Sequence, residues 1–69
     1  AHGAEQGLTE LELLATDLDG YPWFHSSRGE LLRRLERQDE AISSFRRAIA
    51  LTQNQNVIDF LETRLAALN

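Results

Sequence analysis

Apolar residues recur at spacings of three and four in four separate segments of this 69-residue chain, and this period constrains the fold most strongly. In the last segment, Val57, Ile58, Leu61, Leu65 and Leu68 share one helical face. No run of five or more residues alternates apolar and polar side chains as a half-buried strand would. Because the segments are joined by short polar loops, neighbouring helices are expected to be antiparallel. The prediction is an all-α fold, a four-helix antiparallel array of helical hairpins.

Helix starts are marked by capping residues. Thr9 and Glu12 have the spacing of a capping box, which predicts that the first helix begins at Thr9. Pro22 suits the first position of the second helix, because its missing N–H would be unpaired there in any case. Asp39 is expected to cap the third helix, and Asn54 and Asn56 are two possible caps of the fourth.

The helix ends, together with these starts, define the predicted helices and the limits of the domain. Gly20 is expected to take the left-handed conformation that ends the first helix. The predicted helices cover about residues 9–19, 22–36, 39–52 and 55–68. Residues 1–7 carry no periodic pattern and are predicted to be a disordered start or a tag remnant, followed by one domain over 8–69.

Charge and cysteine content exclude several kinds of site. The net charge is −4, with eleven acidic residues against seven arginines, a balance that repels a phosphate backbone. No cysteine is present, so neither a disulfide nor a thiolate metal site can form. The sequence has no signal-peptide pattern and no apolar run long enough to cross a membrane. We therefore expect a cytoplasmic protein without cofactor or metal that binds neither nucleic acid nor membrane.

Small residues at fixed spacing point to the tetratricopeptide repeat (TPR). When Pro22 is taken as the first position of a TPR unit, Gly29 is the eighth, Ala41 the twentieth, Phe45 the twenty-fourth and Ala48 the twenty-seventh. All four match the TPR pattern. Their expected role is structural: Gly29 and the alanines let two helices approach closely, and Phe45 fills the space between them. The unit departs from the pattern in having a His at its fourth position and a Gln at its thirty-second.

A closer resemblance covers about residues 8–69 and is strongest from Tyr21 onward. It is carried by Tyr21, Arg28, Leu31-Leu32-Arg33-Arg34-Leu35, Arg37, Glu40-Ala41, Phe45-Arg46-Arg47-Ala48, Leu51, Asn54, Phe60-Leu61-Glu62 and Arg64-Leu65. This run resembles the TPR-like C-terminal extension of bacterial RNA polymerase sigma factors of the extracytoplasmic-function (ECF) type. Glu36 departs from it, since a glycine usually turns the chain there, and so does Val57, where an acidic residue is common. A left-handed Glu36 would cost about 1 kcal/mol.

The resemblance implies a non-catalytic regulatory domain that controls transcription initiation. Its partners would be the sigma domains of a parent chain, RNA polymerase or a regulatory protein. Two alternatives stay open, a free-standing TPR-type adaptor for a peptide and a module that forms homo-oligomers such as a homodimer.

The TPR resemblance also implies a binding groove lined by the first helix of the unit. The matching residues here are Trp23, Ser26, Glu30, Arg33 and Arg34. Aromatic and Arg side chains dominate binding hot spots, which favours Trp23 as an anchor for a partner. Packing of Trp23 on the first helix or on the sigma domains of a parent chain is the open alternative.

Arg28 interrupts the apolar stripe of the second predicted helix. A guanidinium that faces a core needs a carboxylate or several carbonyl groups. We expect Arg28 to be structural and to pair with Glu62 or Asp59 of the last helix; direct contact with a partner is the open alternative.

Two kinds of chemical site, a hydrolase triad and a calcium loop, have weaker support in the sequence. His25-Ser26-Ser27 near Asp17 and Asp19 contains the residue types of a hydrolase triad, but no strand-to-helix elbow or Gly-rich loop accompanies them. The two Asp residues lack the alternate spacing and Gly turn of a calcium loop. A packed His25 and a solvated acidic helix end are the preferred interpretations.

Overall fold

Helices account for nearly all of the part of the chain that the structure describes. The computed structural model describes residues 2–68, with side chains for 3–68, and these residues contain no strand. The all-α prediction is confirmed. The helices are α1 (His2–Leu13), α2 (Ala15–Leu18), α3 (Pro22–Arg34), α4 (Gln38–Leu51) and α5 (Gln55–Leu68). Among these described residues, no helix is long and apolar enough to cross a membrane.

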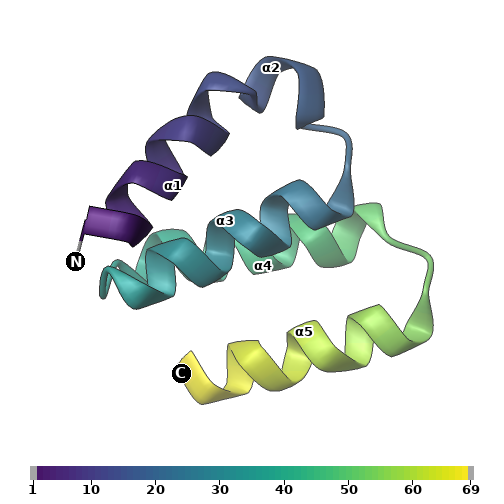
Figure 1. Ribbon diagram of the computed structural model, residues 1–69. Helices are drawn as coiled ribbons and strands as arrows, with labels where there is room; N and C mark the ends of the chain where they lie inside the picture. The colour runs from purple at the N-terminus through teal and green to yellow at the C-terminus, as the bar shows by residue number, and fades with distance from the viewer. Residues whose placement is uncertain (1, 69) are drawn as a thin grey trace.

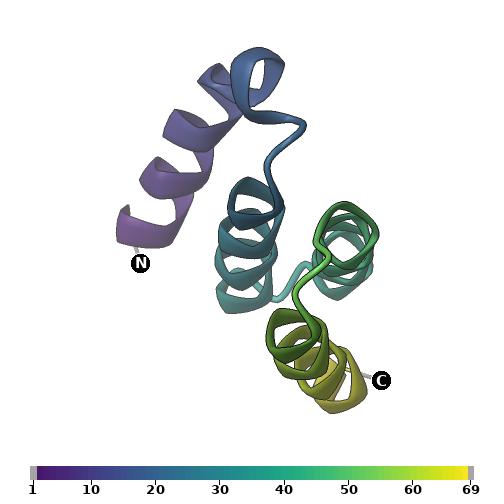
Figure 2. The same cartoon turned by 90° about the vertical axis from the view of Figure 1, so that its right-hand side faces the viewer.

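The four long helices alternate in direction along the chain (Figure 1). α3 and α4 form a closely packed hairpin, α1 packs against α3, and α5 packs against α4. As a result α3 and α5 run parallel to one another, as Figure 1 shows. The end-on view in Figure 2 places α1 and α5 on different sides of the hairpin.

The first helix begins earlier than predicted. α1 starts at His2, so residues 2–7 are helical and not a disordered start, and Ala1 lies outside the described residues. Thr9 is not an N-cap, because it lies inside the helix and its Oγ1 donates a hydrogen bond to the carbonyl oxygen of Glu5 at 3.0 Å. Leu8 is only 7% exposed. Burial of the inner face stabilises the helix upstream of the expected cap.

The predicted first helix is also divided. Leu14, with φ −99° and ψ 1°, separates α1 from the single turn α2, which ends at Leu18. The prediction that Gly20 is left-handed is wrong, since no glycine within residues 2–68 has a positive φ. Asp19 keeps a right-handed helical conformation, so the chain leaves α2 without a glycine cap.

The turn between α3 and α4 is closed by a left-handed residue. Glu36 has φ 60°, and the N–H groups of Glu36 and Arg37 donate to the carbonyls of Arg33 and Leu32 at 3.0 and 2.9 Å. This is the Schellman pattern that glycine usually completes, so Glu36 carries the predicted strain. Asp39 is not the cap of α4: Arg37 holds that position without a side-chain cap, and Asp39 lies in the first turn.

The starts of α3 and α5 agree with the sequence. Pro22 occupies the first turn of α3. At α5, Oδ1 of Asn54 accepts hydrogen bonds from the backbone N–H groups of Asn56 and Val57 at 2.9 and 3.3 Å. The Asn54 side chain thereby satisfies two of the amides that the first turn leaves free.

The core lies between the hairpin and its two flanking helices. Its buried hydrophobic side chains are Leu8, Phe24, Leu32, Ala41, Phe45, Ala48 and Leu61. A Cβ on Gly29 would lie 2.8 to 2.9 Å from three atoms of the Phe45 ring, closer than real Cβ contacts come. The position therefore has to be glycine for α3 and α4 to pack at this distance.

Candidate functional site

The five residues predicted to line a groove all lie on α3. Trp23, Ser26, Glu30 and Arg33 follow one another at spacings of three and four and so share one face of the helix. Trp23 is 52% exposed, and its backbone carbonyl accepts a hydrogen bond from Ser26 Oγ at 3.1 Å. Arg34 is exposed at the end of the helix. Trp23 is therefore accessible to a partner and is not buried on α1.

Glu30 joins α3 to α5. Its Oε2 accepts a hydrogen bond from Arg33 Nη2 at 2.9 Å, and its Oε1 lies 3.1 Å from Arg64 Nε. The contact with Arg64 is an ion pair only. Its geometry is not that of a hydrogen bond, and the buried Oε1 atom of Glu30 accepts no hydrogen bond. The guanidinium of Arg64 also lies over the ring of Phe60, 5.1 Å from its centroid. Glu30 thus fixes two arginines at the junction of the parallel helices.

Exposed apolar side chains flank this ion-paired centre. Phe60 is 53% exposed and Val57 is 37% exposed, and both share the face of α5 that carries Arg64. Tyr21, the residue before α3, is 53% exposed, and its ring centroid lies 6.5 Å from that of Trp23. We call the surface made by Trp23, Ser26, Glu30, Arg33, Val57, Phe60 and Arg64 the α3–α5 face.

The sequence reasoning missed the residues that α5 contributes. A signal for them existed, since Glu30 and Arg64, which touch in the structure, are 34 positions apart, the length of one TPR unit. The same offset relates Trp23 to Val57 and Ser26 to Phe60. Extending the groove positions by one repeat length would have named all three residues.

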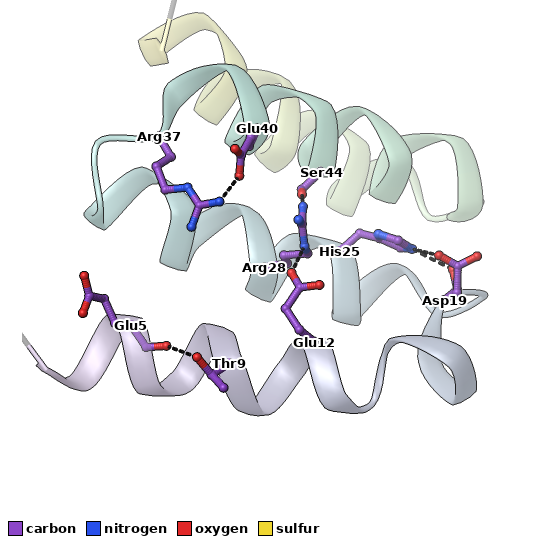
Figure 3. A network of polar contacts seen from close by, with 9 residues as sticks. All are labelled: Glu5, Thr9, Glu12, Asp19, His25, Arg28, Arg37, Glu40 and Ser44. Carbon is purple, nitrogen blue, oxygen red and sulfur yellow. Dashed lines mark hydrogen bonds and ion pairs between the residues drawn. The ribbon is translucent and has the colours of Figure 1, made fainter.

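Arg28 has other partners than those predicted. Its Nε donates to Glu12 Oε1 of α1 at 2.6 Å, and its Nη1 donates to Ser44 Oγ of α4 at 2.6 Å (Figure 3). The expected pairing with Glu62 or Asp59 is therefore wrong. Arg28 lies on the side of α3 that faces α1, whereas those carboxylates belong to α5. Its guanidinium ties three helices together.

A pocket of about 360 Å³ lies beside Arg28. It is lined by Glu12, Ala15, Asp19, Phe24, His25, Arg28, Ser43, Ser44 and Arg47. Asp19 meets two basic groups there, with its carboxylate 3.5 Å from His25 Nε2 and 3.7 Å from Arg47 Nη2. The cations of the pocket thus already face carboxylates of the chain.

His25 is packed as a structural residue. It is 7% exposed, its ring makes an edge contact with Phe24, and its Nε2 lies 2.6 Å from the backbone carbonyl oxygen of Asp19 (Figure 3). An acceptor at that distance requires Nε2 to carry the proton. Within residues 3–68, His25 makes no hydrogen bond with Ser26 or Ser27, so the triad geometry is not assembled there.

No metal centre is formed by the described side chains. Over that part of the chain, no group of three or more His, Cys, Asp or Glu residues is arranged to hold an ion. Asp17 and Asp19 occupy α2 and the residue after it, on the exposed acidic end expected from the sequence.

Similarity to known proteins is limited. No protein-family model matches the chain, and no solved structure matches it significantly. Over 63 residues, or 91% of its length, the chain is 40% identical to part of a protein of Rhizobium meliloti (strain 1021) that bears the name "Uncharacterized protein". The chain spans 15% of the length of that relative.

Proposed function

We propose that this chain is a non-catalytic, TPR-like interaction domain that binds a protein segment along the α3–α5 face. The observation that carries the proposal is the exposure of Trp23 and Phe60, 52% and 53%, on two parallel helices. Aromatic side chains that flank fixed arginines provide the contacts that dominate protein interfaces. Because Glu30 holds Arg33 and Arg64 in place, less side-chain entropy is lost on binding.

The TPR-like assignment has two structural supports. The close approach of Gly29 to Phe45 joins α3 and α4 into a hairpin at the positions where the repeat places small and large residues. The contact between Glu30 and Arg64 then joins equivalent positions of successive units. In this interpretation α1 and α5 are the layers that flank a single complete unit, since repeats bury a continuous core only by stacking.

The resemblance of the sequence supports the proposal that this domain belongs to a bacterial sigma factor of ECF type. There it would act in the cytoplasm and regulate transcription initiation through contacts with the sigma domains, RNA polymerase or a regulatory protein. The similarity to a short part of a much longer protein agrees with a module of this kind.

The test is direct binding to the proposed partners. Because the chain has no cysteine, an Ala66→Cys variant can carry a single fluorophore on an exposed position of α5. Its anisotropy would be measured against bacterial core RNA polymerase and, separately, against the two sigma domains of an ECF-type sigma factor. We expect binding that Trp23→Ala and Phe60→Ala each weaken about tenfold or more, the effect of losing a hot-spot side chain.

Arg46→Ala supplies the matched control, since Arg46 is exposed on α4, away from the α3–α5 face. It should change the affinity by less than about twofold. Circular dichroism of every variant would establish that the helices are retained. Absence of binding to both partners would refute the sigma-factor assignment. Equal effects of all three alanine variants would refute the binding face.

Homo-oligomerisation is a second candidate, because Phe60 on α5 is 53% exposed on the α3–α5 face. Sedimentation equilibrium would decide between the two functions. A dimer that Phe60→Ser dissociates would assign the α3–α5 face to self-association, whereas a monomer leaves it to a different protein.

A further inference from the structure

The junction of α1 and α2 leaves two leucines uncovered. Leu13 is 80% exposed and Leu14 is 47% exposed. The opposite side of the same segment is covered, with Leu8 7% exposed and Leu11 and Ala15 partly buried. Leu13 and Leu14 thus form an apolar outer surface that no described residue of this chain covers.

Acidic residues flank these leucines in helical register. Glu10, Leu13 and Leu14 have the spacings of one face of a helix, and Asp17 follows one turn further on in α2; all four side chains are exposed. The chain is helical on both sides of the break, because the N–H of Leu14 donates to the carbonyl of Leu11 at 2.9 Å and those of Asp17 and Leu18 donate to the carbonyl of Leu14 at 3.1 and 3.0 Å. We call these four residues the α1–α2 outer face.

The charge of this face is uncompensated. No Lys or Arg occurs before Arg28 in the sequence. Arg28 pairs with Glu12 and Arg47 with Asp19, both on the inner side toward the pocket. Within residues 3–68, neither Glu10 nor Asp17 has an ion-pair partner. The outer face therefore combines exposed apolar area with negative charge.

We propose that the α1–α2 outer face is a docking site for a basic amphipathic helix of a protein partner. Leucines one turn or less apart match the rows of apolar side chains that such a helix presents. Lys or Arg beside those rows would meet Glu10 and Asp17, which attract the right partner and repel acidic ones. This site is separate from the α3–α5 face, because α1 lies across the hairpin from α5 (Figure 2).

Charge also selects against other occupants. A second copy of this chain would bring Glu10 and Asp17 against the same acids of its partner, and like charges brought together in an interface are costly. An anionic lipid surface would be repelled in the same way. A basic helix is the occupant that satisfies both the leucines and the carboxylates.

The probe for the test is a labelled peptide of about 14 residues, or four helical turns. Leu occupies the positions of one helical face, and Lys occupies all the remaining positions. Its fluorescence anisotropy would be titrated with the chain at about 50 mM and about 300 mM salt, since the ionic part of the binding is screened between them. A peptide with Glu in place of every Lys is the charge control. Chemical-shift mapping on ¹⁵N-labelled protein would locate the contact.

We expect the Lys peptide to bind and to shift the amides of residues 9–18, and the Glu peptide not to bind. Leu13→Ser with Leu14→Ser, and separately Glu10→Lys with Asp17→Lys, should each weaken binding about tenfold or more. Glu36→Lys with Glu62→Lys makes the same charge change at exposed positions in the α3–α4 turn and on α5, and should have less than about a threefold effect. Trp23→Ala should bind the peptide as wild type does, which separates this test from that of the α3–α5 face.

Three results would overturn the proposal. Equal weakening by the two charge-reversal pairs would mean that the peptide is attracted by net charge alone. Shifts confined to α3 and α5 would place the peptide on the other face. Self-association that Leu13→Ser abolishes, detected by sedimentation, would assign the leucines to a second copy of the chain.

Discussion

Replacing Gly29 by alanine tests the packing of α3 on α4. The added Cβ would lie 2.8 to 2.9 Å from three atoms of the Phe45 ring. Phe45 is 0% exposed, so its ring cannot move away into solvent. Overpacking of this kind costs about 1–3 kcal/mol. Alanine also gains about 1 kcal/mol of helix propensity over glycine, so the net loss of unfolding free energy is up to about 2 kcal/mol.

Gly7→Ala is the matched control. Gly7 also lies inside a helix, but its added Cβ would contact Leu31 at 3.5 Å, an ordinary van der Waals distance. This variant should gain the helix propensity without the overlap and become about 0.5–1 kcal/mol more stable. The difference between the two variants isolates the overlap with Phe45, about 1–3 kcal/mol.

Urea and thermal unfolding followed by circular dichroism would measure both variants. In a domain of this size, 1 kcal/mol corresponds to a shift of about 4–8 °C in Tm. Phe45→Leu removes ring atoms from the contact, so Gly29→Ala should cost less in that background. Equal stabilisation by Gly29→Ala and Gly7→Ala would refute the close approach of the two helices.

Three further substitutions have defined outcomes. Arg28→Ala leaves the hydroxyl of Ser44, which is 3% exposed, without its hydrogen-bond donor. It should lower the unfolding free energy by about 1–2 kcal/mol, measured by urea titration. Arg34→Ala, at an exposed position, should change the unfolding free energy by less than about 0.5 kcal/mol. Leu61→Ala removes the one fully buried side chain among the described residues of α5 and should cost about 2–5 kcal/mol in the same assay; a loss under 1 kcal/mol would contradict its place in the core. Glu36→Gly relieves the positive φ and should raise Tm by an amount corresponding to up to about 1 kcal/mol, whereas Glu36→Ala should not.

The sequence predicted those parts of the fold that depend on local signals. Pro22 and Asn54 mark the starts of α3 and α5 because their backbone constraint and side-chain cap act within one turn. Gly29 and Phe45 were recognised from spacing, because the distance between two hairpin helices requires a small residue opposite a large one. The resemblance to the sigma-factor extension marked position 36 as one where a glycine usually turns the chain, and Glu36 has a positive φ of 60° there.

The missed features depend on contacts between distant segments. Thr9 looked like a cap because its spacing to Glu12 is correct, yet tertiary burial of Leu8 extends the helix to His2. The partner of Arg28 could not be chosen from the sequence, since carboxylates are available on both flanking helices and only the rotation of α3 about its axis decides between them. For the α5 residues of the α3–α5 face the sequence offered only the 34-residue offset, and the parallel placement of the two helices is what brings Glu30 and Arg64 together.

The serial packing of the helices affects how the chain opens. α1 is held mainly by α3 and α5 mainly by α4, so each outer helix can detach while the central hairpin persists. A partner bound across α3 and α5 would stabilise the packed position of α5, because α5 could then detach only after the partner had dissociated. Binding of a partner to the α3–α5 face would therefore slow amide hydrogen exchange along α5, including at backbone positions that the partner does not contact.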